Sequence, residues 1–297
     1  MIKITSFLIV NYKTENLTIN LIESIKKYLK RIEYEILVFD NSPDESKKLK
    51  LIQNKNVFLF SLNSNIGFVK ANNFLFRKSK GDLIILINND VLLIDDSLEK
   101  LINYLQVNSE LGAVGPMLLN TDGSYQVSFY KFPNLWSSFK ELVLLQKKDP
   151  YQYKTNIHEV QTCDVVKGAC LVLRRDIIKD DFIFDEDYEM FSEEVDLCLR
   201  LKKKGFKNVY FPHCRVIHFG GASSNLDENT LKYITYNYYR SKLILFKKHY
   251  SKLHYVILKG LIYISLIERI LIFSILHKFK QVRIFSHTLI KFLLGKR

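Results

Sequence analysis

The chain has 297 residues, 47% of them hydrophobic and 13% aromatic, which suffices for one large domain or for one domain with a smaller companion. Its four cysteines form no CxxC pair, so we expect buried free thiols of a reducing compartment and exclude a disulfide-stapled fold. The formal charge is +13, and because residues 231–297 hold fourteen Lys or Arg against one acid, an electroneutral body carries a basic tail.

The N-terminal apolar run predicts a first strand over residues 4–10. It is too short for a secretory signal and lacks a small-residue cleavage site, so we expect no signal peptide. No stretch of 18 apolar residues is free of charge, so we also expect no membrane-spanning helix.

Apolar runs and helical patterns alternate over the first ninety residues. Strands are expected at 35–39, 57–60 and 83–87, and the last of these has no polar break, as in a strand buried on both faces. Helices are expected after Thr14 and over about 69–78. This alternation predicts βαβ units and therefore an α/β fold with a Rossmann-like, mostly parallel sheet.

Polar turns follow these strands, and the carboxyl ends of parallel strands form the edge where α/β proteins bind ligands. The Asp40 carboxylate can accept hydrogen bonds from a base edge or a ribose. Asn65 and Gly67 permit close approach of the backbone, and Asn72 supplies an amide in the following helix. These residues suit a nucleotide.

Asn88, Asn89 and Asp90 directly follow the fourth strand. Such a cluster can hold a hard divalent cation through oxygen, although the same residue types also favour a plain turn. The GxGxxG fingerprint and the GxxxxGK[ST] loop are both absent, which argues against a hydride-transfer enzyme and against the common kinases and ATPases.

The middle of the chain predicts a hairpin whose strands flank Asp122-Gly123. The aromatic segment 132–160 either shapes a substrate pocket or is a surface excursion. Further elements are expected as follows: a helix at 97–107, strands at 111–119, 125–130 and 208–211, and an apolar strand that follows Lys167-Gly168-Ala169 within residues 165–174.

A second acidic cluster, Glu193, Glu194 and Asp196, lies in an amphipathic segment over 191–200. Carboxylates at a helix N-terminus are favoured by the macrodipole, which is one explanation. The other is that one carboxylate is a general base, since clustered like charges raise one another's pKa. His218 lies beside two glycines; a lone histidine is more often structural than a ligand, and its spacing from His213 and Cys214 is weak for zinc.

Together these motifs resemble the family 2 glycosyltransferases, and within them the rhamnosyltransferase-like bacterial enzymes of surface polysaccharide assembly. The resemblance covers about residues 4–223 in the family's order. The matching segments are Val10-Asn-Tyr12, Asp40-Asn-Ser42, Asn65-Ile-Gly-Phe68 with Asn72-Asn73, Leu86-Ile-Asn-Asn-Asp-Val91, Gly168-Ala169, Phe184-Asp-Glu186, Glu193-Glu-Val-Asp-Leu-Cys-Leu-Arg200, and His218 with Ser223.

The resemblance implies a GT-A fold, expected over residues 1–225, and inverting, metal-dependent transfer from a nucleoside diphosphate sugar to a hydroxyl of a lipid-linked or growing glycan. dTDP-rhamnose is the first choice of donor, with UDP-sugars behind it, and Mg²⁺ or Mn²⁺ is the implied cofactor. Asp90 corresponds to the metal ligand of the family's DxD motif, and His218 to a histidine that completes the metal site in some members. The implied donor-binding residues are Val10, Asn11, Tyr12, Asp40, Asn65, Gly67, Asn72, Asn88, Asn89 and Gly168.

The implied catalytic base is Glu194, with Glu193 and Asp196 as alternatives. Asn88 replaces the first acid of DxD, which lowers the negative charge offered to a metal. Glu194 stands where the family usually has aspartate; one methylene moves the carboxylate by roughly 1 Å, and such a misplacement can cost about 100-fold in rate. These departures keep open an alternative, a catalytically impaired nucleotide-sugar-binding scaffold of a polysaccharide assembly complex.

Residues 226–297 are expected to form basic amphipathic helices. Lys259, Glu268 and Arg269 interrupt the apolar run, which favours helices in the membrane interface over a span. Anionic lipid attracts such segments by about 1 kcal/mol per basic residue. A homodimer contact is the alternative, and the density of Ile, Leu and Phe disfavours nucleic acid. We therefore expect a peripheral enzyme on the cytoplasmic, inner face of the cell membrane.

Overall fold

The computed structural model describes residues 4–42, 47–62, 64–146, 151–153, 156–220 and 227–295. The chain divides into two compact units. Unit 1 comprises residues 1–131, 153–186 and 193–222; unit 2 comprises 132–152, 187–192 and 223–297. The domain boundary at residue 225 stays a prediction, and Ser223 lies outside the described residues.

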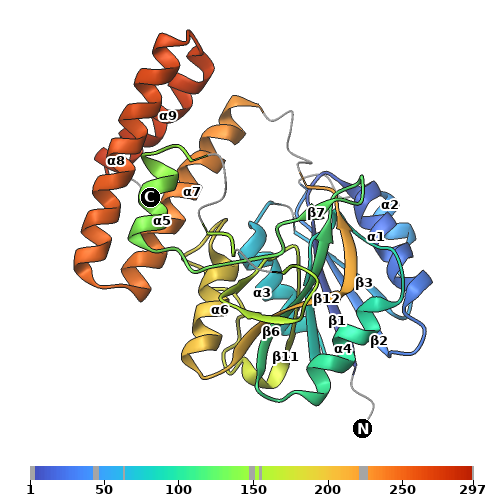
Figure 1. The fold of residues 1–297 in the computed structure, drawn as a ribbon. Coiled ribbons are helices and arrows are strands. Elements are labelled where there is room, and N and C mark those ends of the chain that lie inside the picture. Colours follow the sequence, from blue (N-terminus) through green and yellow to red (C-terminus); the bar gives the residue numbers. More distant parts are fainter. Residues whose placement is uncertain are drawn as a thin grey trace. The chain divides into compact units, whose positions relative to one another are not determined.

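Unit 1 is built on a mixed, mostly parallel sheet (Figure 1). Its main strands are β1 (Thr5–Asn11), β2 (Tyr34–Asp40), β3 (Val57–Ser61), β4 (Leu83–Ile87), β5 (Val91–Leu93), β6 (Leu111–Leu119), β11 (Cys170–Arg174) and β12 (Lys207–His218). Their order is β3-β2-β1-β4-β11-β6-β12-β5. The first four are parallel, and β11 runs antiparallel between β4 and β6. The prediction of a mostly parallel α/β sheet is confirmed.

Helices cover both faces of this sheet (Figure 1). They are α1 (Glu15–Tyr28), α2 (Lys47–Leu51), α3 (Phe68–Lys78), α4 (Ser97–Val107) and α6 (Glu193–Lys203). Ile22 of α1 and Leu101 of α4 belong to one core with Phe7 and Ile85 of the strands, so these two helices share a face. Helices α3 and α6 lie on the other side. Strand β4 is buried throughout, as its unbroken apolar run predicts.

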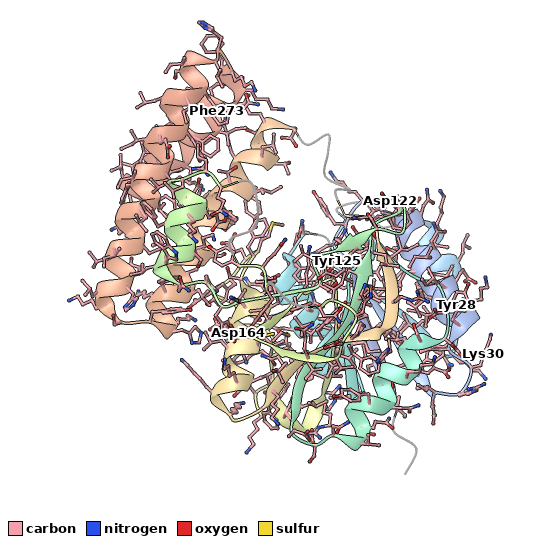
Figure 2. The ribbon with its side chains drawn as sticks, in the orientation of Figure 1. Tyr28, Lys30, Asp122, Tyr125, Asp164 and Phe273 are labelled. Carbon is pink, nitrogen blue, oxygen red and sulfur yellow. The ribbon has the colours of Figure 1, made fainter. Side chains whose placement is uncertain are left out.

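The hairpin forms, but with a longer loop than the two-residue signal predicts. Strand β7 (Tyr125–Gln126) pairs antiparallel with β6 across residues 120–124 (Asp122 and Tyr125 are labelled in Figure 2). Asp122 accepts hydrogen bonds from the backbone and hydroxyl of Ser124, at 2.9 and 2.6 Å, and Gly123 has a φ of +82°. These local bonds stabilise a wider turn.

The prediction of a single strand over residues 125–130 is wrong. Strand β8 (Phe129–Tyr130) leaves the main sheet and pairs with β10 (Val165–Val166). Between β7 and β8, the Ser128 hydroxyl accepts a hydrogen bond from the Leu118 amide at 2.8 Å, which replaces a ladder bond with a side-chain bond. The chain can therefore turn away from β6 without leaving that buried amide unpaired.

Strand β12 is longer than the predicted strand at 208–211. Proline lacks the amide that continues a ladder, so Pro212 predicts an end there. The structure instead shifts register between Phe211 and Arg215; beyond the shift, pairing with β6 resumes and pairing with β5 begins. This irregularity accommodates the proline and carries His218 to the sheet edge.

Unit 2 is helical. It contains α5 (Leu135–Leu142), α7 (Glu228–His249), α8 (Lys252–Ile275, with Phe273 labelled in Figure 2) and α9 (Phe279–Leu293). Its core gathers Leu142, Tyr239, Phe246, Ile262 and Leu266. None of the helices in the described ranges is both long and apolar enough to cross a membrane. All four cysteines, in unit 1, are buried and free, as predicted.

A substitution at Gly81 tests how tightly the backbone packs beside the sheet. A Cβ there would meet the backbone nitrogen of Ser6 at 2.7 Å and the Ile4 carbonyl oxygen at 2.8 Å. We expect Gly81→Ala to lower the free energy of unfolding by about 1–3 kcal/mol, because the methyl group overlaps backbone atoms. In the control, Gly260→Ala in α8, a Cβ meets nothing within 4 Å, and stability should rise by about 0.5–1 kcal/mol. Urea denaturation measures both; a stabilising Gly81→Ala would contradict this account.

Candidate donor and catalytic site

The polar residues predicted to line a site gather at one edge of the main sheet. Asn11 and Asp40 end neighbouring parallel strands and are paired in register. Asn88 follows β4, and its amide donates to the Ala169 carbonyl at 2.9 Å, just before β11. Since β11 is antiparallel to β4, its first residues meet the last residues of β4, which brings Gly168 to the same edge.

A buried amide and hydroxyl network joins the strand ends. The Asn11 amide donates to Asp40 Oδ1 at 2.9 Å, and its oxygen accepts from Thr18 at 2.9 Å and from Asn89 at 3.2 Å. Asn89 also donates to Thr14 at 2.6 Å. Asn11 and Asp40 are fully buried. The network therefore sets the positions of these loops, and Asn89 bonds inward.

Residues before and within α3 form a second group of the predicted site residues. Gly67 has a φ of +85°, and its amide donates to the Asn65 side chain at 2.8 Å. The Asn72 amide donates to the Phe68 carbonyl within the helix at 3.0 Å, and Asn72 is almost fully buried. Tyr12, at the end of β1, is 46% exposed. Their contacts with a nucleotide stay predictions.

Asn73 was not among the predicted site residues, although the adjacent Asn72-Asn73 pair was a signal. It is fully buried. Its oxygen accepts from the amides of Ile183 and Phe184, and its nitrogen donates to the Phe184 carbonyl at 2.8 Å and to Glu186 at 3.2 Å. One amide thus holds the loop that precedes the acidic cluster to α3.

Asp90 and His218 form a facing pair. The His218 Nε2 lies 3.3 Å from Asp90 Oδ1, and the two side chains are 10% and 13% exposed. Val91 pairs with His218 across β5 and β12, and the Phe219 amide donates to the Asp90 carbonyl at 2.9 Å. The backbone itself therefore brings together two residues far apart in sequence.

Gln126 orients the histidine, and no sequence signal identified it. Its side-chain oxygen lies 2.6 Å from His218 Nδ1, and its nitrogen donates to the His218 carbonyl at 3.2 Å. A partner on Nδ1 leaves Nε2 as the ring nitrogen that can bind a metal, as is usual for ligating histidines. The Asp90 carboxylate and the His218 imidazole would supply two ligands to a divalent cation such as Mn²⁺. Over the described part of the chain, no group of three or more His, Cys, Asp or Glu could hold a metal unaided.

The three acids of α6 differ in environment. Asp196 is 1% exposed and forms an ion pair with Arg200 at 2.7 Å. Glu194 Oε1 accepts a hydrogen bond from the Tyr130 hydroxyl at 2.7 Å. Glu193 is held by neither partner, and burial together with the Glu194 charge raises its pKa to about 8. Asp196 is thus engaged within the protein, whereas Glu193 experiences the charge of the neighbouring Glu194.

The family model for glycosyl transferase family 2 matches residues 6–182. The chain belongs to this family. It is 30% identical over 218 residues to rhamnosyltransferase WbbL of Escherichia coli, covering 66% of this chain and 78% of that protein. It is 29% identical over 210 residues to N-acetylglucosaminyl-diphospho-decaprenol L-rhamnosyltransferase of Mycobacterium tuberculosis, covering 65% and 68%.

Solved structures share the fold of this glycosyltransferase. Mannosyltransferase PcManGT from Pyrobaculum calidifontis, in complex with GDP-Man and Mn²⁺, matches with a TM-score of 0.59 and 12% identity over 99% of this chain and 88% of that one. GalNAc-T7 with UDP, GalNAc and Mn²⁺ matches with a TM-score of 0.56 and 16% identity over 80% of this chain, which spans 47% of that longer chain. The expected GT-A fold is confirmed.

The raised pKa of Glu193 predicts a pH-dependent stability. The folded state holds the proton up to about pH 8, whereas the unfolded carboxyl releases it near its ordinary value of 4.5. The wild type therefore loses stability as pH rises between these values. We expect the Tm of Glu193→Gln, relative to wild type, to be higher at pH 8 than at pH 5 by at least about 2–4 °C, the equivalent of roughly 1 kcal/mol. Exposed Glu110→Gln is the control; an equal difference at both pH values would refute the assignment.

Proposed function

We propose that this glycosyltransferase transfers rhamnose from dTDP-rhamnose, with inversion, to a hydroxyl of a lipid-linked or growing surface-polysaccharide acceptor. The observation that carries the chemistry is the convergence at one sheet edge of the Asp90–His218 pair, the Asn11–Asp40 network and the Gly168 segment. The choice of rhamnose rests on the two rhamnosyltransferases and on the dTDP-rhamnosyl transferase RfbF of Shigella flexneri, which is 26% identical over 224 residues.

In this proposal each residue has a separate task. Asp90 and His218 would hold the divalent cation, Mg²⁺ or Mn²⁺, and Gln126 keeps the imidazole oriented. When bound, the cation offsets the negative charge that develops on the diphosphate leaving group. Glu194 accepts the proton of the acceptor hydroxyl, and that oxygen attacks the anomeric carbon opposite the leaving group.

Because of Asn88, the protein alone should bind a metal ion only weakly. An amide oxygen carries no net charge, so the site relies on Asp90 and on the oxygens of the diphosphate. Metal and nucleotide should therefore bind together. The alternative function, a nucleotide-sugar-binding scaffold, shares the binding step and lacks the transfer.

A thermal-shift screen with dTDP, UDP and GDP, each with and without Mn²⁺, tests the donor site. We expect dTDP with Mn²⁺ to raise the Tm most, because a ligand that binds only the folded state stabilises it by about 2.7 kcal/mol at 100 times its Kd. Asp90→Asn should abolish the metal-dependent part. Asp176→Asn, whose side chain is 75% exposed, is the matched control.

The outcomes separate the candidate functions. A metal-dependent shift together with hydrolysis or transfer of the donor sugar supports the transferase. A shift without any turnover favours the scaffold. A chain that no nucleotide stabilises has no donor site, and both functions would then be abandoned.

We propose further that the protein acts at a membrane surface through helix α8. Its residues Leu258, Ile262 and Leu266 pack in the core of unit 2. A second apolar face of the same helix is 41–76% exposed; this α8 stripe consists of Leu253, Val256, Ile257, Ile264, Ile267, Leu271 and Ile275. Exposed Lys252 and Lys259 lie on the same helix. An apolar face with basic neighbours fits an anionic lipid surface.

Vesicle co-sedimentation tests the α8 stripe. We expect Ile264→Glu with Leu271→Glu to weaken binding to phosphatidylglycerol vesicles at least about tenfold, because burial of each side chain contributes roughly 1.5–3 kcal/mol. Val107→Glu in α4, where the valine is 81% exposed, is the control. Unchanged vesicle binding with a loss of dimers in size-exclusion chromatography would instead identify the stripe as a subunit interface.

A further inference from the structure

The carboxylate of Glu194 is held on two sides within unit 1. The Tyr130 hydroxyl donates to Oε1 at 2.7 Å. A Cβ built on Gly168 would lie 3.4, 3.6 and 3.8 Å from Cβ, Cγ and Cδ of Glu194, so the glycine backbone packs along the length of the side chain. Among the described residues, the second oxygen, Oε2, is buried and has no hydrogen-bond partner.

Both sides of this clamp come from one small β-ribbon. Strand β8 pairs with β10 so that Tyr130 lies opposite Val165, and the Lys167 amide donates to the Ser128 carbonyl at 3.0 Å. Phe129 stacks on Tyr210 of β12, with ring centroids 4.4 Å apart. The ribbon is therefore fixed to the main sheet, and it presents Tyr130 and Gly168 to the start of α6.

In the hydrogen bond between Tyr130 and Glu194, the phenol is the donor and the carboxylate is the acceptor. Burial and the adjacent carboxylate raise the pKa of Tyr130 well above its usual 10, so the phenol keeps its proton and donates. An ionised carboxylate only accepts hydrogen bonds, and it has two oxygens. With Oε1 occupied by Tyr130, Oε2 remains for another donor, and a buried polar atom without a partner is costly unless a ligand completes it.

Glu193 is the competing base, because its Oε2 is also buried without a partner among the described residues. Its raised pKa means that it is mostly protonated at neutral pH, so it accepts a proton poorly. No side chain among the described residues donates to this Oε2. The two neighbouring acids therefore differ in restraint, since Glu194 accepts a hydrogen bond from the Tyr130 hydroxyl.

We propose that Tyr130 is a positioning residue that holds Glu194 through Oε1 and thereby leaves Oε2 to take the proton of the acceptor hydroxyl. This inference rests on the proposed function. In the step, the acceptor O–H proton passes to Oε2 and the acceptor oxygen bonds to the anomeric carbon. The bond from that carbon to the diphosphate breaks, its electron pair leaves with the diphosphate, and Tyr130 keeps its own proton.

The clamp also explains how glutamate can serve where the resembled family usually has aspartate. The longer side chain has one more rotatable bond, and an unrestrained carboxylate would sample several positions. Tyr130 restrains its end and Gly168 leaves room along its stem. In Gly168→Ala, the new methyl group would contact the Glu194 side chain at ordinary van der Waals distance. In Tyr130→Phe, by contrast, the Glu194 carboxylate loses its hydrogen bond and is free to move.

Steady-state kinetics of Tyr130→Phe against pH test the proposal. Loss of a hydrogen bond to a charged group should lower kcat roughly 10- to 100-fold. The KM for the donor should stay unchanged, and the acid side of the pH profile should move to higher pH because the anion has lost its donor. Tyr153→Phe is the control, since its hydroxyl accepts from the Asp164 amide at 3.1 Å in the same aromatic cluster. Wild-type kinetics in Tyr130→Phe would overturn the proposal.

A stability cycle gives a readout that needs no activity. Tyr130→Phe is measured in the wild type and in Glu194→Met, which removes both acceptor oxygens at similar length. We expect the loss of stability from Tyr130→Phe to shrink in the Glu194→Met background. An additive cycle overturns the clamp whatever the activity. If the cycle is coupled but the wild type transfers no sugar, the proposed function is refuted. The contact between Tyr130 and Glu194 is then confirmed, but its positioning role in catalysis is refuted together with the function.

Discussion

The hydrogen bond between Asn11 and Asp40 is the contact on which the rest of the site depends. It links the ends of two neighbouring parallel strands, and through Asn89 it reaches the turn that follows β4. Asn11 and Asp40 are fully buried, so their polar groups need partners within the protein, and they pair with one another. The loops that would hold a nucleotide are consequently fixed before any ligand arrives, which is the preorganisation that a transferase requires.

The chain departs from its resembled family at two positions, and both departures have local support. Asn88 removes a charge near the proposed cation, while Gln126 orients His218 toward Asp90. Glu194 carries an extra methylene, while Tyr130 and Gly168 restrain it. In each case the supporting residue comes from the β6–β7 hairpin or from the β8–β10 ribbon, which are the segments where the chain leaves the regular alternation of strand and helix.

Unit 2 shows a different balance of forces. Helix α8 buries one apolar face and exposes another. Within the helical core, the Lys242 ammonium pairs with Glu141 at 2.6 Å and contacts Tyr151 at 3.1 Å, so this buried charge is matched. The exposed residues of the α8 stripe are therefore part of the surface of unit 2 and are distinct from the residues of α8 that pack in its core.

The sequence by itself determined the alternation of strands and helices, the buried character of β4 and the basic apolar tail, because these follow from local periodicity and composition. It also showed Asp90 after an apolar strand and Glu194 in an acidic cluster, whereas the roles expected for these residues and for His218 came from the resemblance to the family 2 glycosyltransferases. Only the tertiary structure decided that β11 lies antiparallel beside β4, that β12 continues past Pro212, and that Gln126 and Tyr130 support His218 and Glu194. The two side-chain contacts join residues 64 and 92 positions apart, and nothing in a local pattern records which distant side chain will satisfy a buried polar atom.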